Sequence, residues 1–489
     1  MKHSKLIATV LPAALCLAAL MSCGDAADNT GAETSAPTTD ATVTEAVTEP
    51  GYPAPDTSSL DFGGDELRIF SIEWGNFAKY YFPDEATGDS VDDACYARLV
   101  NVQEALNVKI ADVVWGADGS AHKDVLKTVQ AGDDAFDFVF THCIDGYSDY
   151  ATSNAMYNLD ALPYVDFDAP WWSKNMIDTF RIGSETYFGF GDIILNSPSC
   201  MFFNKEIADE YDMPNHYQMV RDGKWTYDTF LTQARQVSVD VNGDGKMDYN
   251  DKTGFAGDLT EALGNIPFAL GMQLTTYTDE GIQLNFWSDK LLEIFNKTYD
   301  YFLDPTVCQG YFRQKVDVGQ SFSEGLALYT ISNPGGMAGL RDADIEFGAI
   351  PMPKYDESQE NYRSYVWSSS VCVPTTILRP ELVGAALEQF AYESKPVTQA
   401  YIEDLIRGKS TRDTETLEML DIIYATQVID IGGTYLGFDQ SFRKVFYCFY
   451  DLLSAKNNNV ASFYEKSVMA ILKVLDNLYT KVIENQESN

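Results

Sequence analysis

The sequence predicts an α/β fold, because short apolar runs typical of strands alternate with helical stretches from residue 66 to residue 140. Length is the second observation: about 430 residues follow a polar N-terminal segment, which fits two domains or one domain with two lobes. Composition is the third, because 45% hydrophobic and 13% aromatic residues are typical of a well-packed globular protein.

The order of the elements predicts a parallel sheet. Strand, helix, strand, helix and strand are expected in turn over residues 66–71, 91–106, 107–114, 122–131 and 136–140. This alternation implies right-handed crossovers between parallel strands. Further helices are expected over residues 290–302, over 380–392, and from about residue 414 to the C-terminus.

The N-terminus carries the features of an export signal. Lys2 and Lys5 precede an apolar run over residues 6–21, and small Ser22 stands directly before Cys23. The pattern resembles the lipobox of bacterial lipoproteins, which implies that residues 1–22 are removed and that Cys23 is lipidated. Acyl chains on Cys23 would hold the protein outside the cytoplasm, anchored to the cell membrane. The alternative is an ordinary signal peptide with an incidental cysteine.

Residues 23–60 are expected to form a disordered tether. They are rich in Ala, Thr, Ser, Asp, Glu, Pro and Gly. Such a segment buries too little apolar area to offset the entropy of ordering it, and its acidic charges repel one another.

Charge and cysteine content exclude several classes of function. The formal net charge of −39 repels nucleic acid, so no nucleic-acid partner is expected. None of the six cysteines beyond Cys23 forms a CxxC pair or a zinc-binding spacing with histidine. One or two disulfides remain open, with a pairing that spacing does not indicate.

Residues 240–251 follow the twelve-position pattern of a calcium-binding loop. Oxygen-bearing side chains stand at positions 1, 3, 5, 9 and 12, and glycine stands at position 6. The expected ligands are Asp240, Asn242, Asp244, the backbone carbonyl of Lys246, Asp248 and Asp251. The loop resembles EF-hand and dockerin loops and predicts one structural Ca²⁺, with no organic cofactor. The alternative is an Asx-rich turn without metal.

Four short segments, taken in order, resemble the extracellular solute-binding proteins (family 1) of carbohydrate-type bacterial ABC importers. They are MFFNKEI at 201–207, GKWTYDTF at 223–230, FSEGLAL at 322–328 and FGAIPMPK at 347–354. The resemblance covers roughly residues 61–489, behind the lipobox and the tether.

The resemblance implies a periplasmic-binding-protein-like (type II) fold, with two lobes, hinge strands and a ligand cleft between the lobes. Lobe one would hold residues 61–192 plus 356–398, and lobe two residues 193–355 plus 399–489, with crossings near 190–200, 350–360 and 395–405. It also implies a monomer that binds a carbohydrate, closes on it and docks on ABC permease subunits in the membrane.

Sugars are bound by aromatic rings, which stack on their apolar faces, and by carboxylates and amides, which bond their hydroxyls. Trp74, in a polar loop after the first strand, and Trp367 are therefore candidate stacking residues. Trp172 is a third, because adjacent tryptophans in an extended segment point opposite ways, so that one of the pair faces the cleft. For each ring, the alternative is packing in the core.

Three polar residues complete the candidate ligand site. Asp145 follows the strand at 136–140, where the resemblance places a carboxylate that binds hydroxyls; the alternative is capping of its loop. Asn196 lies at the first proposed crossing. Asn333 lies in a glycine-containing loop after the strand at 327–331, where backbone N–H groups could approach a ligand.

Three functions other than import are alternatives. A secreted glycoside hydrolase would use two carboxylates, but no HExxH, GxSxG, P-loop or GxGxxG motif is present, so no enzyme activity is expected. A surface adhesion lipoprotein and a binding protein for a non-sugar solute stay open as alternatives.

Overall fold

The computed structural model describes residues 53–57, 59–73, 82–117, 119–278, 280–311, 319–340, 342–406 and 414–488. The predicted signal, Cys23 and most of the predicted tether lie outside the described residues. The unit Glu49–Asn489 is compact. Thr57, inside the predicted tether, is buried and donates from Oγ1 to Gln389 Oε1 at 2.6 Å. The predicted tether is therefore too long at its C-terminal end.

One lobe is built on a four-stranded sheet with the order β15-β5-β2-β4. β2 (Ile69–Glu73) runs parallel to β4 (Val114–Ala117) and to β5 (Phe138–His142). The predicted parallel sheet is confirmed, and α2 (Ser90–Leu106) and α3 (Ala121–Gln130) form its crossovers. The strand expected over 107–114 is wrong in its bounds, because Val108–Ile110 pairs outside this sheet and the strand of the sheet begins at Val114. β15 (Ser369–Cys372) adds an antiparallel strand from a distant part of the chain.

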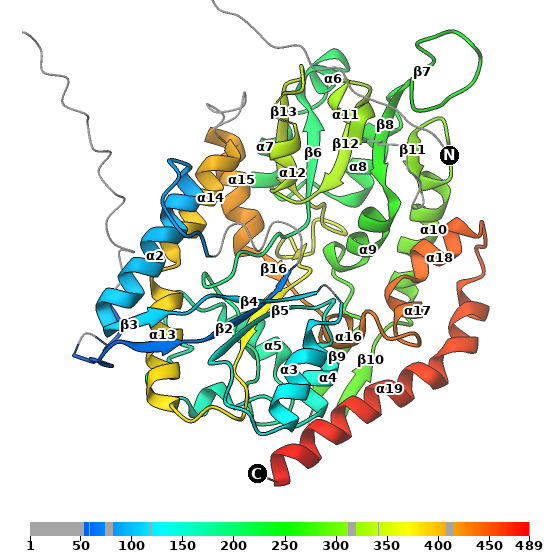
Figure 1. Cartoon of the computed structure of the whole chain (residues 1–489). Helices are drawn as coiled ribbons and strands as arrows, with labels where there is room; N and C mark the ends of the chain where they lie inside the picture. The colour runs from blue at the N-terminus through cyan, green and yellow to red at the C-terminus, as the bar shows by residue number, and fades with distance from the viewer. Residues whose placement is uncertain are drawn as a thin grey trace, which may run out of the picture. The chain divides into compact units, whose positions relative to one another are not determined.

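The second lobe is built on a sheet with the order β11-β8-β12-β6-β13, in which β7 also pairs with β8 (Figure 1). β11 and β12 run parallel to β8, and β6 runs antiparallel to β12 and to β13. The strands are β6 (Cys200–Asn204), β7 (Ser238–Val239), β8 (Lys252–Asp258), β11 (Cys308–Tyr311), β12 (Ala327–Ser332) and β13 (Phe347–Pro351).

The remaining elements cover these sheets or link them. Three strand pairs lie outside the two large sheets: β1 (Asp65–Leu67) with β3 (Val108–Ile110), β9 (Thr275–Thr278) with β10 (Gly281–Leu284), and β14 (Ser364–Tyr365) with β16 (Gln427–Val428). The shorter helices are α4 (Tyr147–Thr152), η1 (Leu159–Ala161), α5 (Lys174–Phe180), α6 (Lys205–Glu210), α7 (His216–Arg221), α8 (Tyr227–Ala234), α11 (Gly319–Ser323), α12 (Gly336–Gly339), α16 (Ile431–Leu436), α17 (Arg443–Phe446) and α18 (Cys448–Ser454). The longer ones are α9 (Leu259–Ala269), α10 (Asp289–Phe302), α13 (Pro380–Tyr392), α14 (Lys395–Ile406), α15 (Thr414–Ala425) and α19 (Val460–Ser488). The strands of each large sheet fall within the residue ranges predicted for one lobe, while the exact lobe boundaries stay a prediction.

Three connecting segments lie side by side between the two sheets: residues 196–199, 364–369 and 426–428. Ser199 N donates to Tyr365 O at 2.8 Å, and Val366 N donates to Val428 O at 3.0 Å. The side chain of Asn196 accepts from Ser369 N at 2.9 Å. Main-chain hydrogen bonds therefore hold the passages between the lobes to one another.

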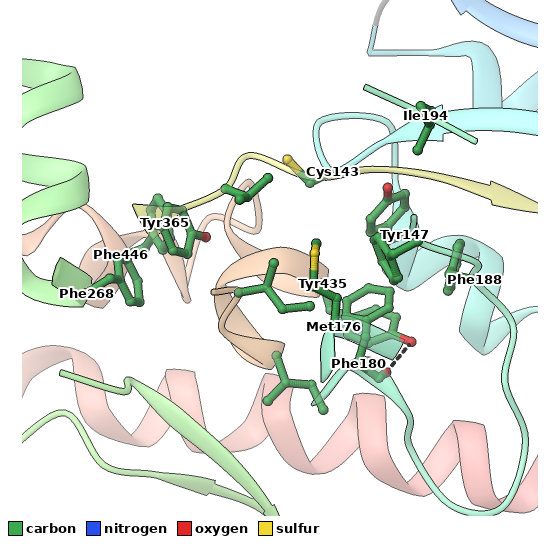
Figure 2. Packing of buried hydrophobic residues seen from close by; sticks show 14 of the residues in the cluster. Cys143, Tyr147, Met176, Phe180, Phe188, Ile194, Phe268, Tyr365, Tyr435 and Phe446 are labelled. Carbon is green, nitrogen blue, oxygen red and sulfur yellow. Dashed lines mark hydrogen bonds between the residues drawn. The ribbon is translucent and has the colours of Figure 1, made fainter. Parts of the chain in front are cut away.

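α16 packs against both lobes. Its N-terminal Asp430 is fully buried and accepts from Thr275 N at 2.9 Å and from Thr275 Oγ1 at 2.8 Å, on β9. At its other end, Tyr435 stacks on Phe180 of α5 with ring centroids 4.0 Å apart, and its hydroxyl donates to Phe180 O (Figure 2). The C-terminal helices thus close a hydrophobic core that continues from one lobe to the other.

α19 extends this contact along the first lobe, and Figure 1 shows it in red beside α4 and β10. Asn485 Nδ2 donates to Ala151 O of α4 at 3.5 Å, and Gln486 Nε2 donates to Ile182 O at 2.8 Å. Among the described residues, no helix is long and apolar enough to cross a membrane.

The six described cysteines are free and buried. They are Cys95, Cys143, Cys200, Cys308, Cys372 and Cys448. Burial raises the pKa of these thiols, so they act as small apolar core residues, and the structure pairs none of them.

Tyr435→Ala tests the contact between the C-terminal helices and the first lobe. Loss of a stacked, buried ring is expected to lower the free energy of unfolding by about 3–5 kcal/mol, measured by denaturant titration. Leu378→Ala is the control, because Leu378 is 77% exposed and its truncation should change stability by less than about 0.5 kcal/mol. Equal losses in the two variants would contradict the role of Tyr435.

Candidate functional site

The edge of the second sheet at which β8 and β12 end carries polar side chains. The two strands are parallel neighbours, so their carboxyl ends meet at the same edge, where α/β folds bind ligands. Asp258 closes β8 and caps α9 by accepting from Thr260 N at 2.7 Å. Asn333 follows β12, is half-buried and begins the turn that leads into α12.

Glu261 lies in the first turn of α9, close to Asp258. Its side chain is exposed, yet surrounding protein raises the pKa of its carboxyl, and neighbouring Asp258 raises it further. Asn265, one turn later and 1% exposed, lies with Nδ2 at 3.5 Å from Glu261 Oε2. This trio of two carboxylates and an amide is suited to accept hydrogen bonds from ligand hydroxyls, which would relieve the repulsion between the acids.

An aromatic surface lies on the connecting segments and the helices beside them. We define it by Trp367, Phe438 and Tyr447; the ring centroids of Phe438 and Tyr447 lie 5.8 and 6.3 Å from that of Trp367. Phe438 is 50% exposed and Trp367 is half-buried, whereas Tyr447, at 7% exposed, lies beside Trp367 and offers no open ring face itself. Within the described chain, Trp367 Nε1 is buried without a hydrogen-bond acceptor. An unpaired buried N–H is costly, so this indole favours an acceptor supplied by a ligand or by water.

The loop after β5 joins the same region, because Cys143 N donates to Ser368 O at 2.9 Å. Asp145 in this loop is fully buried, and its Oδ1 lies 3.1 Å from His122 Nδ1. His122 Nε2 lies 3.2 Å from Asp149 Oδ2. The carboxylates of Asp145 and then Asp149, which accept hydrogen bonds from the imidazole, raise the pKa of His122 to about 9. In this structure Asp145 therefore fastens its loop to α3.

The orientation expected for Trp172 is wrong. Trp172 N donates to Ala169 O, so the pair of tryptophans lies in a turn and not in an extended strand. Both indoles consequently point to one carboxylate, and Trp171 Nε1 and Trp172 Nε1 donate to Glu388 at 3.0 and 2.9 Å. Burial raises the pKa of Glu388 to about 7. Trp172 is 5% exposed and offers no open ring face to a ligand.

The other predicted ligand residues divide between the two parts of the structure. Asn196 and Trp367 lie together at the connecting segments, close to the loop that carries Asp145. Asn333 lies instead at the edge of the second sheet. Trp74 lies outside the described residues.

The predicted calcium loop connects two antiparallel strands, β7 and β8. Asp240 accepts from Gly243 N at 2.6 Å and from Gly245 N at 2.8 Å, and Asp251 accepts from Val241 N at 3.0 Å and from Asp248 N at 2.9 Å. Gly245, at the sixth position, has φ of +80°, a conformation that suits glycine. Among the described residues, no group of three or more His, Cys, Asp or Glu side chains is arranged as a ready metal site.

Sequence reasoning missed Asp258, Glu261, Asn265, Phe438 and Tyr447 as site residues. A signal for the first two was available, because Asp258 directly follows the run Thr-Gly-Phe-Ala-Gly within β8 and Glu261 stands three residues later. No local pattern indicates Phe438 and Tyr447, since their place beside Trp367 depends on how the C-terminal helices pack.

No protein-family model matches the chain, and no curated protein matches it. Solved structures match its fold. The GacH receptor of Streptomyces glaucescens, determined unliganded and with acarbose, aligns with a TM-score of 0.55 and 13% identity, over 84% of this chain and 99% of its own. The MalE maltose/maltodextrin-binding domain of Bdellovibrio bacteriovorus, bound to maltotriose, aligns with a TM-score of 0.51 and 12% identity, over 84% and 99%.

UgpB of Mycobacterium tuberculosis, in complex with glycerophosphocholine, aligns with a TM-score of 0.55 and 16% identity, over 86% of this chain and 100% of its own. At these identities the likeness establishes the fold. The chain has the two-lobed α/β fold of periplasmic binding proteins.

The ion pairs of His122 predict a specific pH dependence. A histidine whose pKa is raised stabilises the fold fully below its unfolded value of about 6.5, and this contribution is lost as pH rises through about 9. The stability difference between the natural protein and His122→Gln should therefore be larger at about pH 6 than at about pH 10, measured by urea unfolding. A difference that stays constant between these pH values would contradict the charged pairing.

Proposed function

We propose that this protein is the substrate-binding lipoprotein of an ABC transporter, which captures a sugar or oligosaccharide and delivers it to a membrane permease. The observation that carries the proposal is the aromatic surface of Trp367, Phe438 and Tyr447 at the connecting segments of a two-lobed binding-protein fold. The fold supports it further, because GacH and MalE, which share it, are described in complex with acarbose and maltotriose.

The ligand is proposed to lie between the lobes, beside the connecting segments. The half-buried Trp367 and the exposed Phe438 offer apolar ring area to the face of a sugar. On the second sheet, Asp258, Glu261 and Asn265 offer acceptors for hydroxyl groups, a chemistry that complements the rings. Contacts to both lobes would favour the closed form over the open form.

The alternatives differ in the support they have. A binding protein for a non-sugar solute is the stronger alternative, because UgpB shares the fold and is described with glycerophosphocholine. A glycoside hydrolase has less support, because the solved structures named above are receptors and binding proteins. A surface adhesion lipoprotein would need no ligand site of this kind.

The N-terminal segment fits this function. A lipid on Cys23 would anchor the protein outside the cytoplasm, and the polar segment after it would let the binding domain move between collecting solute and reaching the permease. A monomer that binds one solute molecule is sufficient to collect the solute and deliver it to the permease.

We further propose that residues 240–251 bind one structural Ca²⁺. The oxygen ligands would be those of Asp240, Asn242, Asp244, the Lys246 carbonyl, Asp248 and Asp251. Asp251 is 1% exposed and connects both ends of the loop through its hydrogen bonds, which favours one compact conformation. The ion would offset the mutual repulsion of the loop carboxylates.

A screen for ligands tests the proposed import function. Thermal unfolding is measured with mono- and oligosaccharides, glycerophosphocholine, amino acids, peptides and polyamines, because a ligand of the folded state raises Tm. A carbohydrate is expected to raise Tm, and Trp367→Ala should weaken its binding by about 1–3 kcal/mol in calorimetry. Trp287→Ala is the matched control, since Trp287 is 41% exposed and lies outside the aromatic surface.

Stabilisation only by non-sugars would overturn the carbohydrate assignment, and turnover of a glycoside would overturn the transport assignment. Unchanged affinity in Trp367→Ala would remove that ring from the site.

Calorimetric titration of chelator-treated protein tests the calcium loop. One Ca²⁺ is expected to bind with a dissociation constant no weaker than about 1 mM, as for extracellular calcium modules. Asp240→Ala should abolish binding, whereas Asp84→Ala, an exposed acid outside the loop, should leave it intact. Absence of heat at millimolar calcium would rule the site out.

A further inference from the structure

A pocket of about 460 Å³ lies at the far end of α9 from Glu261. It is formed by the end of α9, the start of α10 and the loop between β13 and β14; its lining includes Gly271, Lys290, Tyr355, Gln359, Glu360 and Arg363. The eleven residues of α9 span about 16 Å at 1.5 Å per residue, so the pocket is separate from the proposed sugar site. Its volume suits a small organic molecule.

Two cations meet in this pocket. Lys290 and Arg363 are both half-buried, and neither forms a salt bridge with any described carboxylate. Lys297, on the same helix as Lys290, instead pairs with Asp228 at 2.7 Å and with Glu293 at 2.9 Å. In a chain with 73 acidic and 34 basic residues, these two half-buried cations share one pocket without an ion pair.

The local contacts hold both cations in place without neutralising them. Arg363 Nε donates to Phe268 O at 3.0 Å, and Lys290 Nζ lies 4.3 Å from the centroid of the Tyr355 ring. Burial lowers the pKa of both groups. At Lys290 the charge of Asp356 opposes this lowering of the pKa and that of Arg363 adds to it, and at Arg363 the charge of Asp430 opposes it. The two charges are therefore desolvated and repel each other, a cost that a bound anion would remove.

The loop that faces the cations is preorganised. Gln359 Nε2 donates to Ala269 O at 3.0 Å and to Asn361 O at 2.9 Å, and Gln359 Oε1 accepts from Tyr355 N at 3.0 Å. Gly271 has φ of +79°, and a Cβ there would lie 3.1 Å from Lys290 Nζ. Glycine thus leaves room for the ammonium group at this position.

Neither acid of the pocket forms a salt bridge with the two cations, although the charge of Asp356 favours the protonated form of Lys290. Asp356 Oδ1 accepts from Ser358 N at 2.9 Å, from Ser358 Oγ at 2.6 Å and from Gln359 N at 3.1 Å, within its own turn. Glu360 is exposed.

We propose that Lys290 and Arg363 form a second ligand site, which binds a small molecule through an oxyanion group, either a phosphate or a carboxylate. Arg363 offers its guanidinium fork and Lys290 a point charge, the usual pair of donors for such groups. The site is independent of the proposed import function, because no residue of the aromatic surface or of the Asp258–Glu261–Asn265 trio lines the pocket.

Calorimetry on the full chain tests the site with four probes: inorganic phosphate, glycerol 3-phosphate, gluconate and neutral glucose. At least one anion is expected to bind, and Lys290→Gln and Arg363→Gln should each weaken it at least about tenfold. Lys297→Gln, the matched charge change on α10, should bind as the natural protein does, and Glu360→Gln should bind the anion more tightly.

Binding of inorganic phosphate or glycerol 3-phosphate would identify a phosphate site. Binding of gluconate alone would identify a carboxylate site. Either result supports the proposal. Absence of anion binding at about 10 mM, equal stabilisation by potassium chloride at matched ionic strength, or unchanged affinity in both Lys290→Gln and Arg363→Gln would overturn it. Thermal unfolding of each variant verifies that it is folded. If a variant loses anion binding but still binds any sugar found in the ligand screen, the anion site and the proposed import function are tested separately.

Discussion

Backbone hydrogen bonds among residues 196–199, 364–369 and 426–428 hold the two lobes of this protein together where the chain passes between them. Each segment passes between the two sheets, and each satisfies its main-chain groups on the others through Ser199–Tyr365 and Val366–Val428. A buried N–H or C=O without a partner is costly, so these passages hold one another in register. The side chain of Asn196 adds a further bond to Ser369.

This register decides what each lobe presents to the region between them. Trp367 stands in the middle of the central segment, so its ring reaches Phe438 and Tyr447 only because residues 364–369 are fixed against their neighbours. Arg363 stands directly before the same segment and points to the other end of α9. Residues 363–369 therefore supply one residue to each proposed ligand site: Arg363 to the anion pocket and Trp367 to the sugar site. α9 links the two, since Phe268 stacks on Tyr365 at 4.1 Å between centroids.

Most of the regular structure of the first sheet was predictable from local pattern. The helix expected over residues 91–106 is α2, and the strand expected over 136–140 is part of β5, because apolar period and strand length are properties of adjacent residues. β15 was not foreseen beside β5, since no local signal tells a strand which distant partner it joins. The expectation for Trp172 failed for a related reason: a turn at Ala169 replaced the assumed extended backbone and turned both indoles toward Glu388.

The alternation of strands and helices and the twelve-position loop follow from the sequence, because each depends on residues that are neighbours in the chain, and the acidic net charge follows from composition. Packing in three dimensions was needed to show that Asp145 is engaged by His122, that Trp367 lies beside Phe438, and that Lys290 meets Arg363. These groups come from segments far apart in sequence or depend on how a helix is placed. Their burial and electrostatics exist only when packing brings the segments together, so no pattern along the chain specifies them.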